Sequence, residues 1–533
     1  MSSWRGVMRW AAMMTMAACL PAALHAQGLD EALRDVDNEA AFFARNPRLL
    51  GMGRIRSAVR DVHNRISLWE LGNPVGLLSG DSTSIFEVGL GSASQRSEYD
   101  LAPTARVRQD ASNGALNLPL EAWHRTERTA YGFGGRFGTL QTDRTYNQDV
   151  ERRTEFVSPY LAPTLNSVVP VIKNPRLRYA LRLDYAPETI TRDFRLITKN
   201  GAGDFVNQDG TIIPAPDTFI PLDAEVDVLG GGAWLGYEWG AVGVGLGYER
   251  LSYDFFGINE GARHRAESSE ERPYNITQLT LAGKTGAFEW GVDGRSWEAE
   301  SEQQWVYSVS AGTAVAPLAG RGRVLERKEE GGTGELRARW TSGSLEIGVS
   351  AIGEDRVIDF VAPAIDDRTS FNYFRNRVYN TPGADTLSLP DSITTQRTED
   401  RSWAGTIGAS WTFKRVLLAL EGRRDFREHE NTLSDLGPRV EGFDVRSGIE
   451  YHATDRLALR GGYGYRWEDT DEQTQMTEYR GYELTAGLGI EAASKRWGVD
   501  LAFGHGWAFA DYGSPQEPRG VGQRFSTRIR WAL

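Results

Sequence analysis

Cysteine is almost missing from this chain: the only one among 533 residues is Cys19. The remainder of the chain therefore has no disulfide and no cysteine-ligated metal to stabilise its fold. Long apolar runs are missing as well. After residue 26 no run reaches the roughly 18 apolar residues that a transmembrane helix requires, and the mean hydropathy is only −0.44. These absences exclude a helical membrane protein.

An excess of positive charge and the common catalytic motifs are also absent. The formal net charge is −12, so nucleic acid is not an expected partner. None of the six histidines after residue 26 has a metal-binding spacing, and no Gly-x-Ser-x-Gly elbow is present. We therefore expect no enzymatic activity, no metal and no cofactor. A catalytic site assembled from distant strands is the alternative that the sequence leaves open.

Glycine and aromatic residues, in contrast, are abundant. The chain has 59 Gly, and Phe, Trp and Tyr make up 11% of it. Together with the low hydropathy, this composition is typical of many short strands that have one apolar and one polar face.

Residues 1–26 have the features of a Sec signal peptide. Two arginines make its start positive, an apolar run follows, and Ala26 offers a small residue before a cleavage that would leave Gln27 first. A lipoprotein cleavage at Cys19 is the alternative, but the apolar run continues beyond Cys19. The leader predicts export from the cytoplasm.

From about residue 82 to the end, the dominant hydrophobic period is two, as in β-strands. In the last segment one face carries Phe525, Thr527, Ile529, Trp531 and Leu533, and the other carries Arg524, Ser526, Arg528, Arg530 and Ala532. Three arginines opposite an apolar strip fit a polar lumen and a lipid-facing wall. We predict an all-β fold: a transmembrane antiparallel β-barrel over residues 82–533 in the outer membrane of a Gram-negative-type bacterium. Its apolar final strand is expected to be recognised by the barrel-assembly machinery.

Aromatic residues near the ends of the apolar strips predict the interfacial girdles of such a barrel. Four tryptophans on these strips are expected to contact outer-membrane lipid: Trp403, Trp411, Trp507 and Trp531. His505 interrupts one strip. We interpret it as lying at a register shift or near the lipid headgroups, and not as a buried titrating group.

The connections between strips alternate in length. Short turns are expected near residues 239–241, 284–287, 341–344, 413–415, 453–456 and 493–496, and long polar loops near 194–223, 302–331 and 361–396. Outer-membrane barrels have short periplasmic turns and long outer loops. The strips predict 14–18 strands, with eighteen favoured. One of these strands is expected near 154–171, where Pro159, Pro163 and Pro170 weaken it.

Charges of both signs are expected on the lumen side. They are Arg178, Arg182, Asp184, Asp293, Arg295, Glu335, Arg337, Arg339, Asp444, Arg446, Arg460, Arg466, Asp500, Arg528 and Arg530. A ladder that selects a charged solute is one interpretation. Because opposite signs alternate around the wall, we favour a network of ion pairs that fills the interior.

Residues 27–81 show no strand period. They contain Gly51-Met52-Gly53-Arg54, then Asp61, and then Asn73-Pro74-Val75-Gly76-Leu77 shortly before the first expected strand. A segment of this length is too small to be stable as a separate domain. We expect it to lie in the mouth of the barrel, with Asn73 and Pro74 forming a turn.

This opening resembles that of FadL-type outer-membrane barrels, which take up long-chain fatty acids and aromatic hydrocarbons. PorV-like barrels of the type IX secretion system share the same opening. Val75 departs from the alanine that is usual in the family. The resemblance implies that residues 27–81 form a hatch inside the lumen. Its expected positions are Gly51, Gly53, Arg54, Asn73, Pro74 and Gly76, and the alternative is that Asn73-Pro74 is only a turn.

The resemblance also implies a channel for the passive uptake of hydrophobic or amphipathic small molecules. A PorV-like structural or partner-binding barrel and a general porin are the alternatives. A porin needs a continuous aqueous pore. A hydrophobic channel needs a blocked lumen with an apolar pocket near the loops, and a partner-binding barrel needs neither.

Overall fold

A computed structural model covers the whole chain. It describes residues 45–59, 73–75, 84–100, 108–125, 129–147, 152–157, 160–174, 177–198, 219–261, 264–309, 318–362, 394–431, 439–471, 476–494, 496–511 and 519–532. The predicted signal peptide and Gly76 lie outside these residues, so the leader stays a prediction. Among the described residues, no helix is both long and apolar enough to cross a bilayer.

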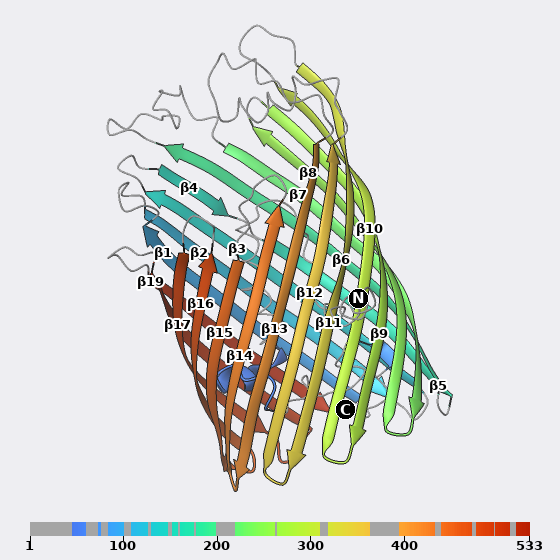
Figure 1. Cartoon of the computed structure of the whole chain (residues 1–533), viewed down its shortest axis with the longest axis vertical. Coiled ribbons are helices and arrows are strands. Elements are labelled where there is room, and N and C mark those ends of the chain that lie inside the picture. The colour runs from blue at the N-terminus through green and yellow to red at the C-terminus, as the bar shows by residue number, and fades with distance from the viewer. Residues whose placement is uncertain are drawn as a thin grey trace, which may run out of the picture.

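Nineteen strand segments of the described chain form one antiparallel sheet (Figure 1). The first ten are β1 (Ser84–Asp100), β2 (Arg108–Arg125), β3 (Thr129–Asn147), β4 (Arg152–Val157), β5 (Tyr160–Asn174), β6 (Leu177–Thr198), β7 (Phe219–Trp239), β8 (Val242–Gly261), β9 (His264–Thr285) and β10 (Phe288–Val309). The others are β11 (Leu318–Ser342), β12 (Leu345–Ala362), β13 (Thr394–Phe413), β14 (Val416–Asn431), β15 (Arg439–Thr454), β16 (Leu457–Asp471), β17 (Met476–Glu491), β18 (Trp497–Asp511) and β19 (Arg519–Ala532).

The sheet closes on itself because the last strand pairs with the first. Ile85 at the start of β1 lies opposite Ala532 at the end of β19. Closure leaves no edge of unpaired backbone groups, which is the condition for a sheet to exist in a bilayer. The predicted barrel is confirmed, and the two ends of the wall lie side by side at the end that carries the short turns.

The strands β4 and β5 are two pieces of one wall strand. Both pair with β6, and the register that joins Val157 to Asp193 continues from Tyr160 to Ile190. Counting the two pieces once, the nineteen segments occupy eighteen positions in the described wall. The pairing of β5 with β6 is interrupted around Pro163 and Pro170, because proline has no N–H to donate to the ladder. The prolines thus weaken this strand without abolishing it.

The expected short turns are confirmed. The pairs β7–β8, β9–β10, β11–β12 and β13–β14 are joined by two-residue connections. Gly240, Gly286 and Gly343 begin three of these turns with φ near +60°, and Lys414 begins the fourth with φ 52°. Positive φ matches the backbone twist of tight hairpins, which explains the three glycines.

Two expected loop boundaries are wrong. Residues 302–309 and 318–331 belong to β10 and β11, and β6 extends to Thr198 while β7 begins at Phe219. Here the wall continues beyond the apolar band, and its outer face becomes charged. Its outward residues include Glu298, Glu300 and Lys328, so the sequence resembles that of a loop. Figure 1 shows the strands between β6 and β13 as the taller side of the barrel.

Candidate functional site: the two faces of the wall

Large apolar side chains are exposed on the outer face of the barrel. On β13, Trp403, Ile407 and Trp411 are 44%, 62% and 51% exposed, whereas Ala404, Gly408 and Ser410 of the opposite face are buried. Eight residues from Trp403 to Trp411 span about 26 Å of strand. The apolar band of outer-membrane barrels is about 25 Å tall. Such a continuous apolar surface belongs in lipid.

The molecule is an outer-membrane β-barrel. All four predicted tryptophans lie on its outer face, where Trp531 pairs with Phe86 of β1 and Trp507 lies opposite Tyr482 of β17. The pairing also continues without a shift through His505, whose ring is 5.7 Å from that of Trp507. The interpretation of His505 as a register shift is therefore wrong, and its place beside an interfacial Trp fits the headgroup region.

A charge at the middle of the band is expected to destabilise the barrel strongly. Ile407 lies midway between Trp403 and Trp411, and the next-door Thr406 points into the lumen. An arginine at the midplane of a barrel costs about 2–4 kcal/mol, falling to about 0–1 kcal/mol near the interfaces. Ile407→Arg should therefore lower the free energy of unfolding by about 3 kcal/mol in urea titrations in lipid vesicles.

Thr406→Arg is the matched control and should cost much less. Trp411→Arg should lie between Ile407→Arg and Thr412→Arg, because Trp411 is close to the turn-side interface. Equal losses for Ile407→Arg and Thr406→Arg would contradict the assignment of the two faces.

On the inner face, charged side chains form pairs. Arg182 contacts Asp184 at 2.8 Å, Arg446 contacts Asp444 at 2.8 Å, and Arg460 reaches Asp500 of β18 at 2.7 Å. The fifteen predicted lumen charges all fall on inward positions of the register. The network of ion pairs is therefore the better interpretation, because most of these charged side chains pair with one another.

Residues 45–59 are seated on this inner face. They include the short helix α3 (Pro47–Gly51), which contacts β16, β17, β18 and β19. Proline suits the first turn of a helix because no N–H is needed there. Leu49, Met52 and Ile55 are fully buried and pack with Ala419 of β14. Figure 1 shows this helix within the lower part of the barrel, toward the short turns.

Carboxylates of the wall hold the segment through charge and through its backbone. Glu450 accepts two hydrogen bonds from the Arg48 guanidinium, at 2.9 and 2.7 Å. Glu421 accepts from the backbone N–H groups of Arg56 and Ser57 at 2.8 and 2.6 Å, and from the Ser57 hydroxyl at 2.7 Å. Hydrogen bonds to an ionised acceptor are about twice as strong as neutral ones. Glu421 and Glu450 are thus the main anchors of the segment.

Arginines of the wall donate hydrogen bonds to backbone carbonyl groups of the same segment. Arg528 donates to the carbonyl oxygen of Arg45 at 2.8 Å, and Arg446 donates to that of Arg54 at 3.1 Å. Burial lowers the pKa of the Arg54 guanidinium well below its usual range, and the charge of Glu483, at 3.2 Å, opposes this effect. The segment therefore depends on the wall for hydrogen bonds and for the pairing of its buried charges.

Wall glycines make room for this backbone. A Cβ on Gly462 would overlap Gly53, one on Gly448 would overlap the Met52 carbonyl, and one on Gly348 would overlap the Ser57 carbonyl. Gly53 has φ +77° where the chain leaves the helix, and its N–H donates to the Thr485 hydroxyl at 2.9 Å. The glycines of the inner wall therefore accommodate residues 45–59 only along the backbone course that these residues follow.

Residues 73–75 occupy a second, smaller seat on β6–β9. The Asn73 side chain donates to Thr280 at 3.2 Å and accepts from the backbone N–H of Val75 at 3.2 Å. Arg178 donates to the Val75 carbonyl at 3.3 Å. A side chain on Gly245 would overlap Asn73. Asn73 thus caps a local turn and fixes that turn to the wall.

The structure therefore brings five of the six predicted hatch positions against the inner wall: Gly51, Gly53, Arg54, Asn73 and Pro74. The sixth, Gly76, is outside the described residues. Sequence reasoning missed the partners of these positions, above all Glu421, Glu450 and Thr485. Their strand period placed them in the lumen, but nothing in a strand period says which inward residue meets a segment that comes from far away in the chain.

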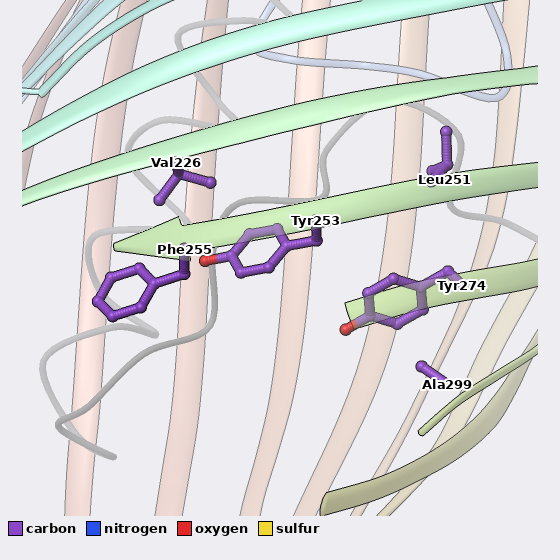
Figure 2. Close-up of a cluster of buried hydrophobic side chains, with 6 residues drawn as sticks. All are labelled: Val226, Leu251, Tyr253, Phe255, Tyr274 and Ala299. Atoms are coloured by element: carbon purple, nitrogen blue, oxygen red, sulfur yellow. The ribbon is translucent and has the colours of Figure 1, made fainter. Parts of the chain in front are cut away.

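Aromatic and aliphatic side chains form a patch on the inner wall farther toward the loops. Figure 2 shows its six members on neighbouring strands: Val226, Leu251, Tyr253, Phe255, Tyr274 and Ala299. All are at most 8% exposed. Val228, Ile276 and Trp297 pack against them. We call these nine residues the inner aromatic patch.

A charged cluster borders the inner aromatic patch. Arg272 lies 5.1 Å from the ring centre of Tyr253 and donates to the Tyr274 hydroxyl at 2.9 Å. Glu270 binds Arg272 at 2.5 and 2.9 Å, and the Tyr274 hydroxyl donates to Glu329 at 3.0 Å. Two arginines of β11 and β12 complete the cluster by pairing with Glu329. The Tyr274 hydroxyl is satisfied here, and the rings of Tyr253 and Tyr274 remain apolar.

Within the described ranges, no group of three or more His, Cys, Asp or Glu side chains is placed to hold a metal ion. No family model and no curated protein matches the chain.

Among solved structures, the chain is similar to the toluene transporter TodX of Pseudomonas putida, with 10% identity, a TM-score of 0.33 and coverage of 91% of this chain and 97% of that one. CymD, a monoaromatic hydrocarbon channel, has 12% identity and a TM-score of 0.34, with coverage of 91% of this chain and 97% of that one. TodX and CymD are FadL-family channels. The ferric yersiniabactin uptake receptor FyuA of Yersinia pestis has 9% identity and a TM-score of 0.41, with coverage of 85% of this chain and 80% of that one.

Proposed function

We propose that this protein is a passive outer-membrane channel for hydrophobic or amphipathic small molecules. The observation that carries the proposal is the combination of two features in one lumen. Residues 45–59 and 73–75 occupy the turn-side part, and the inner aromatic patch lies on the loop side of them. A blocked lumen with an apolar surface near the loops is what a hydrophobic channel needs.

The physical argument concerns water. An apolar solute is barely soluble in an aqueous pore, so it gains from a surface on which about 25 cal/mol is recovered per Å² of apolar area removed from water. The rings of Tyr253, Phe255 and Tyr274 are at most 8% exposed in the structure, so in this proposal they become such a surface when the ligand enters. The charged side chains around these rings are paired with one another. In this proposal the ligand first contacts the patch, and residues 45–59 act as a hatch that has to shift before passage.

A general porin is less well supported, because a porin needs an open aqueous path and residues 45–59 are fixed across the turn-side wall by many hydrogen bonds. A PorV-like partner-binding barrel has one feature in its favour, namely that its lumen needs no path at all. The uptake experiment below separates the three.

Phe255 and Phe256 provide a matched pair for this test. They are neighbours on β8, but Phe255 is buried in the patch whereas Phe256 is on the outer face and 43% exposed. Phe255→Asn should slow the uptake of the apolar dye N-phenyl-1-naphthylamine by about tenfold in Gram-negative cells that express the protein, because losing about 1.5 kcal/mol of apolar contact lowers ligand occupancy by that factor. Phe256→Asn should leave uptake unchanged.

Reconstituted liposomes give the second measurement. The wild-type protein should not admit sucrose in a swelling assay. Rapid sucrose entry would favour the porin, and dye uptake that does not depend on the protein at all would favour the partner-binding barrel.

A further inference from the structure

A groove lies on the outer, lipid-facing side of the wall formed by β12–β16. It has a volume of about 640 Å³ and is lined almost entirely by apolar side chains. The small residues Ala409, Ser447 and Gly461 line the bottom of the groove, and the larger Trp411, Leu418 and Tyr463 line its sides. The groove exists because small residues face outward on three strands where their neighbours are large.

The groove is on the turn side of the membrane. Trp411 and Leu418 each lie three residues from the β13–β14 turn, and Leu345 is the first residue of β12. Three residues of strand span about 10 Å, and one leaflet of hydrocarbon is about 15 Å thick. The Trp411 indole is fixed at this end by a 2.8 Å hydrogen bond to the Ser344 hydroxyl. The groove therefore lies within the periplasmic leaflet.

Cations gather at the headgroup end of the groove. Lys414 and Arg415 form the β13–β14 turn, and Arg456 belongs to the adjacent β15–β16 turn. Arg415 joins the two turns by donating to the Ala453 carbonyl at 3.2 Å. Asp455, 97% exposed, lies 3.9 Å from Arg415. Three cations and one carboxylate leave a surplus of two positive charges, all on exposed residues.

We propose that this groove and the Lys414–Arg415–Arg456 cluster together form a binding site for an anionic phospholipid of the periplasmic leaflet. An acyl chain fills the apolar groove, and the phosphodiester lies among the three cations. Charge complementarity decides the occupant, because each lysine or arginine near an anionic surface attracts it measurably. Lys414 also has its Nζ 5.4 Å from the Phe413 ring centre, which keeps the ammonium at headgroup depth.

The test is native mass spectrometry of the full-length protein, titrated in detergent with dioleoylphosphatidylglycerol or with dioleoylphosphatidylethanolamine. The wild-type protein should retain the anionic lipid preferentially. The variant K414N/R415Q/R456Q should lose about tenfold or more in affinity for the anionic lipid and change little for the zwitterionic one. Asparagine is chosen at residue 414 because it tolerates positive φ.

Two controls separate a specific site from the general lipid shell. Arg424→Gln removes an exposed outward arginine from the same strand β14, beside Trp403 on the loop side of the groove, and it should leave binding unchanged. Ser447→Phe fills the groove and should lower the affinity for the anionic lipid severalfold, whereas Val445→Phe, on the same face of β15 outside the groove, should not.

Equal retention of the two lipids by the wild-type protein would overturn the proposal. An equal loss in Arg424→Gln and in the triple variant would overturn it too, since the cluster would then act only as part of the overall charge. If Ser447→Phe binds like the wild-type protein, the groove holds no acyl chain and the proposal also fails.

Discussion

Deleting residues 46–72 is expected to convert a poorly conducting barrel into a strongly conducting one. The deleted part includes α3, the Arg48 side chain that Glu450 binds, and the backbone that Glu421, Arg446 and Arg339 hold against the inner wall. Those wall groups would then face water in the lumen, where their charges are solvated at little cost. The barrel itself should persist, because its backbone hydrogen bonds close within the wall.

The measurement is the single-channel current in planar bilayers. We expect rare, small openings for the intact protein and large, steady currents for the deletion. A wild-type protein that already conducts steadily would contradict the hatch and favour the porin. If neither protein conducts, the lumen is closed by wall side chains, and the partner-binding barrel becomes the better proposal.

A single-residue variant tests the same point without a deletion. Gly462 and Gly464 are inward glycines on β16, two residues apart. A Cβ on Gly462 would overlap the backbone of Gly53, whereas one on Gly464 has its nearest neighbours at 3.8 Å. Gly462→Ala should therefore displace residues 45–59 and raise the current, and Gly464→Ala should conduct like the wild-type protein.

Deleting residues 524–533 is expected to abolish assembly. These residues form most of β19, which pairs with β18 on one side and with β1 on the other. Without them, two strand edges would expose unpaired N–H and C=O groups to hydrocarbon, and each such group costs several kcal/mol. The loss of about ten residues should therefore lower the stability of the barrel more than any single substitution does.

The measurement is heat-modifiable migration in gels, together with outer-membrane fractionation. The deletion of residues 46–72 serves as the control, since it removes more residues but no strand of the wall, and it should keep the heat-modifiable form. A truncated chain without residues 524–533 that still migrates as a folded barrel would show that β19 is not needed for closure.

Strand identity was predictable because lipid and lumen impose opposite chemistry on alternate residues. In β19, the predicted apolar strip of Phe525, Thr527, Ile529 and Trp531 lies on the outer face of the wall, opposite the inward arginines. The two-residue period does not depend on contacts elsewhere. Where the wall rises beyond the lipid, as in β10 and β11, the outer face carries charges instead of apolar residues, the hydrophobic period disappears, and the sequence predicted loops.

The expected hatch positions follow from a family resemblance in a short local pattern, and that pattern gives no information on their partners in the wall. Arg48 meets Glu450 across 402 residues of chain, and Ser57 meets Glu421 across 364. A strand period shows that Glu421 and Glu450 point inward, as many other charges do. Which of these charges pair with one another and which hold residues 45–59 depends on the curvature and stagger of the closed wall.

The sequence by itself determined the alternating wall, the turn positions, the outward tryptophans and the inward charges, because each follows from residues that are neighbours along one strand. Only the tertiary structure decided that Gly348, Gly448 and Gly462 make room for a distant backbone, and that aromatic and aliphatic side chains of four strands gather into one patch. Both depend on closure. When a tilted sheet closes, its shear fixes which inward residues of separate strands share one height in the lumen, and no single strand carries that information.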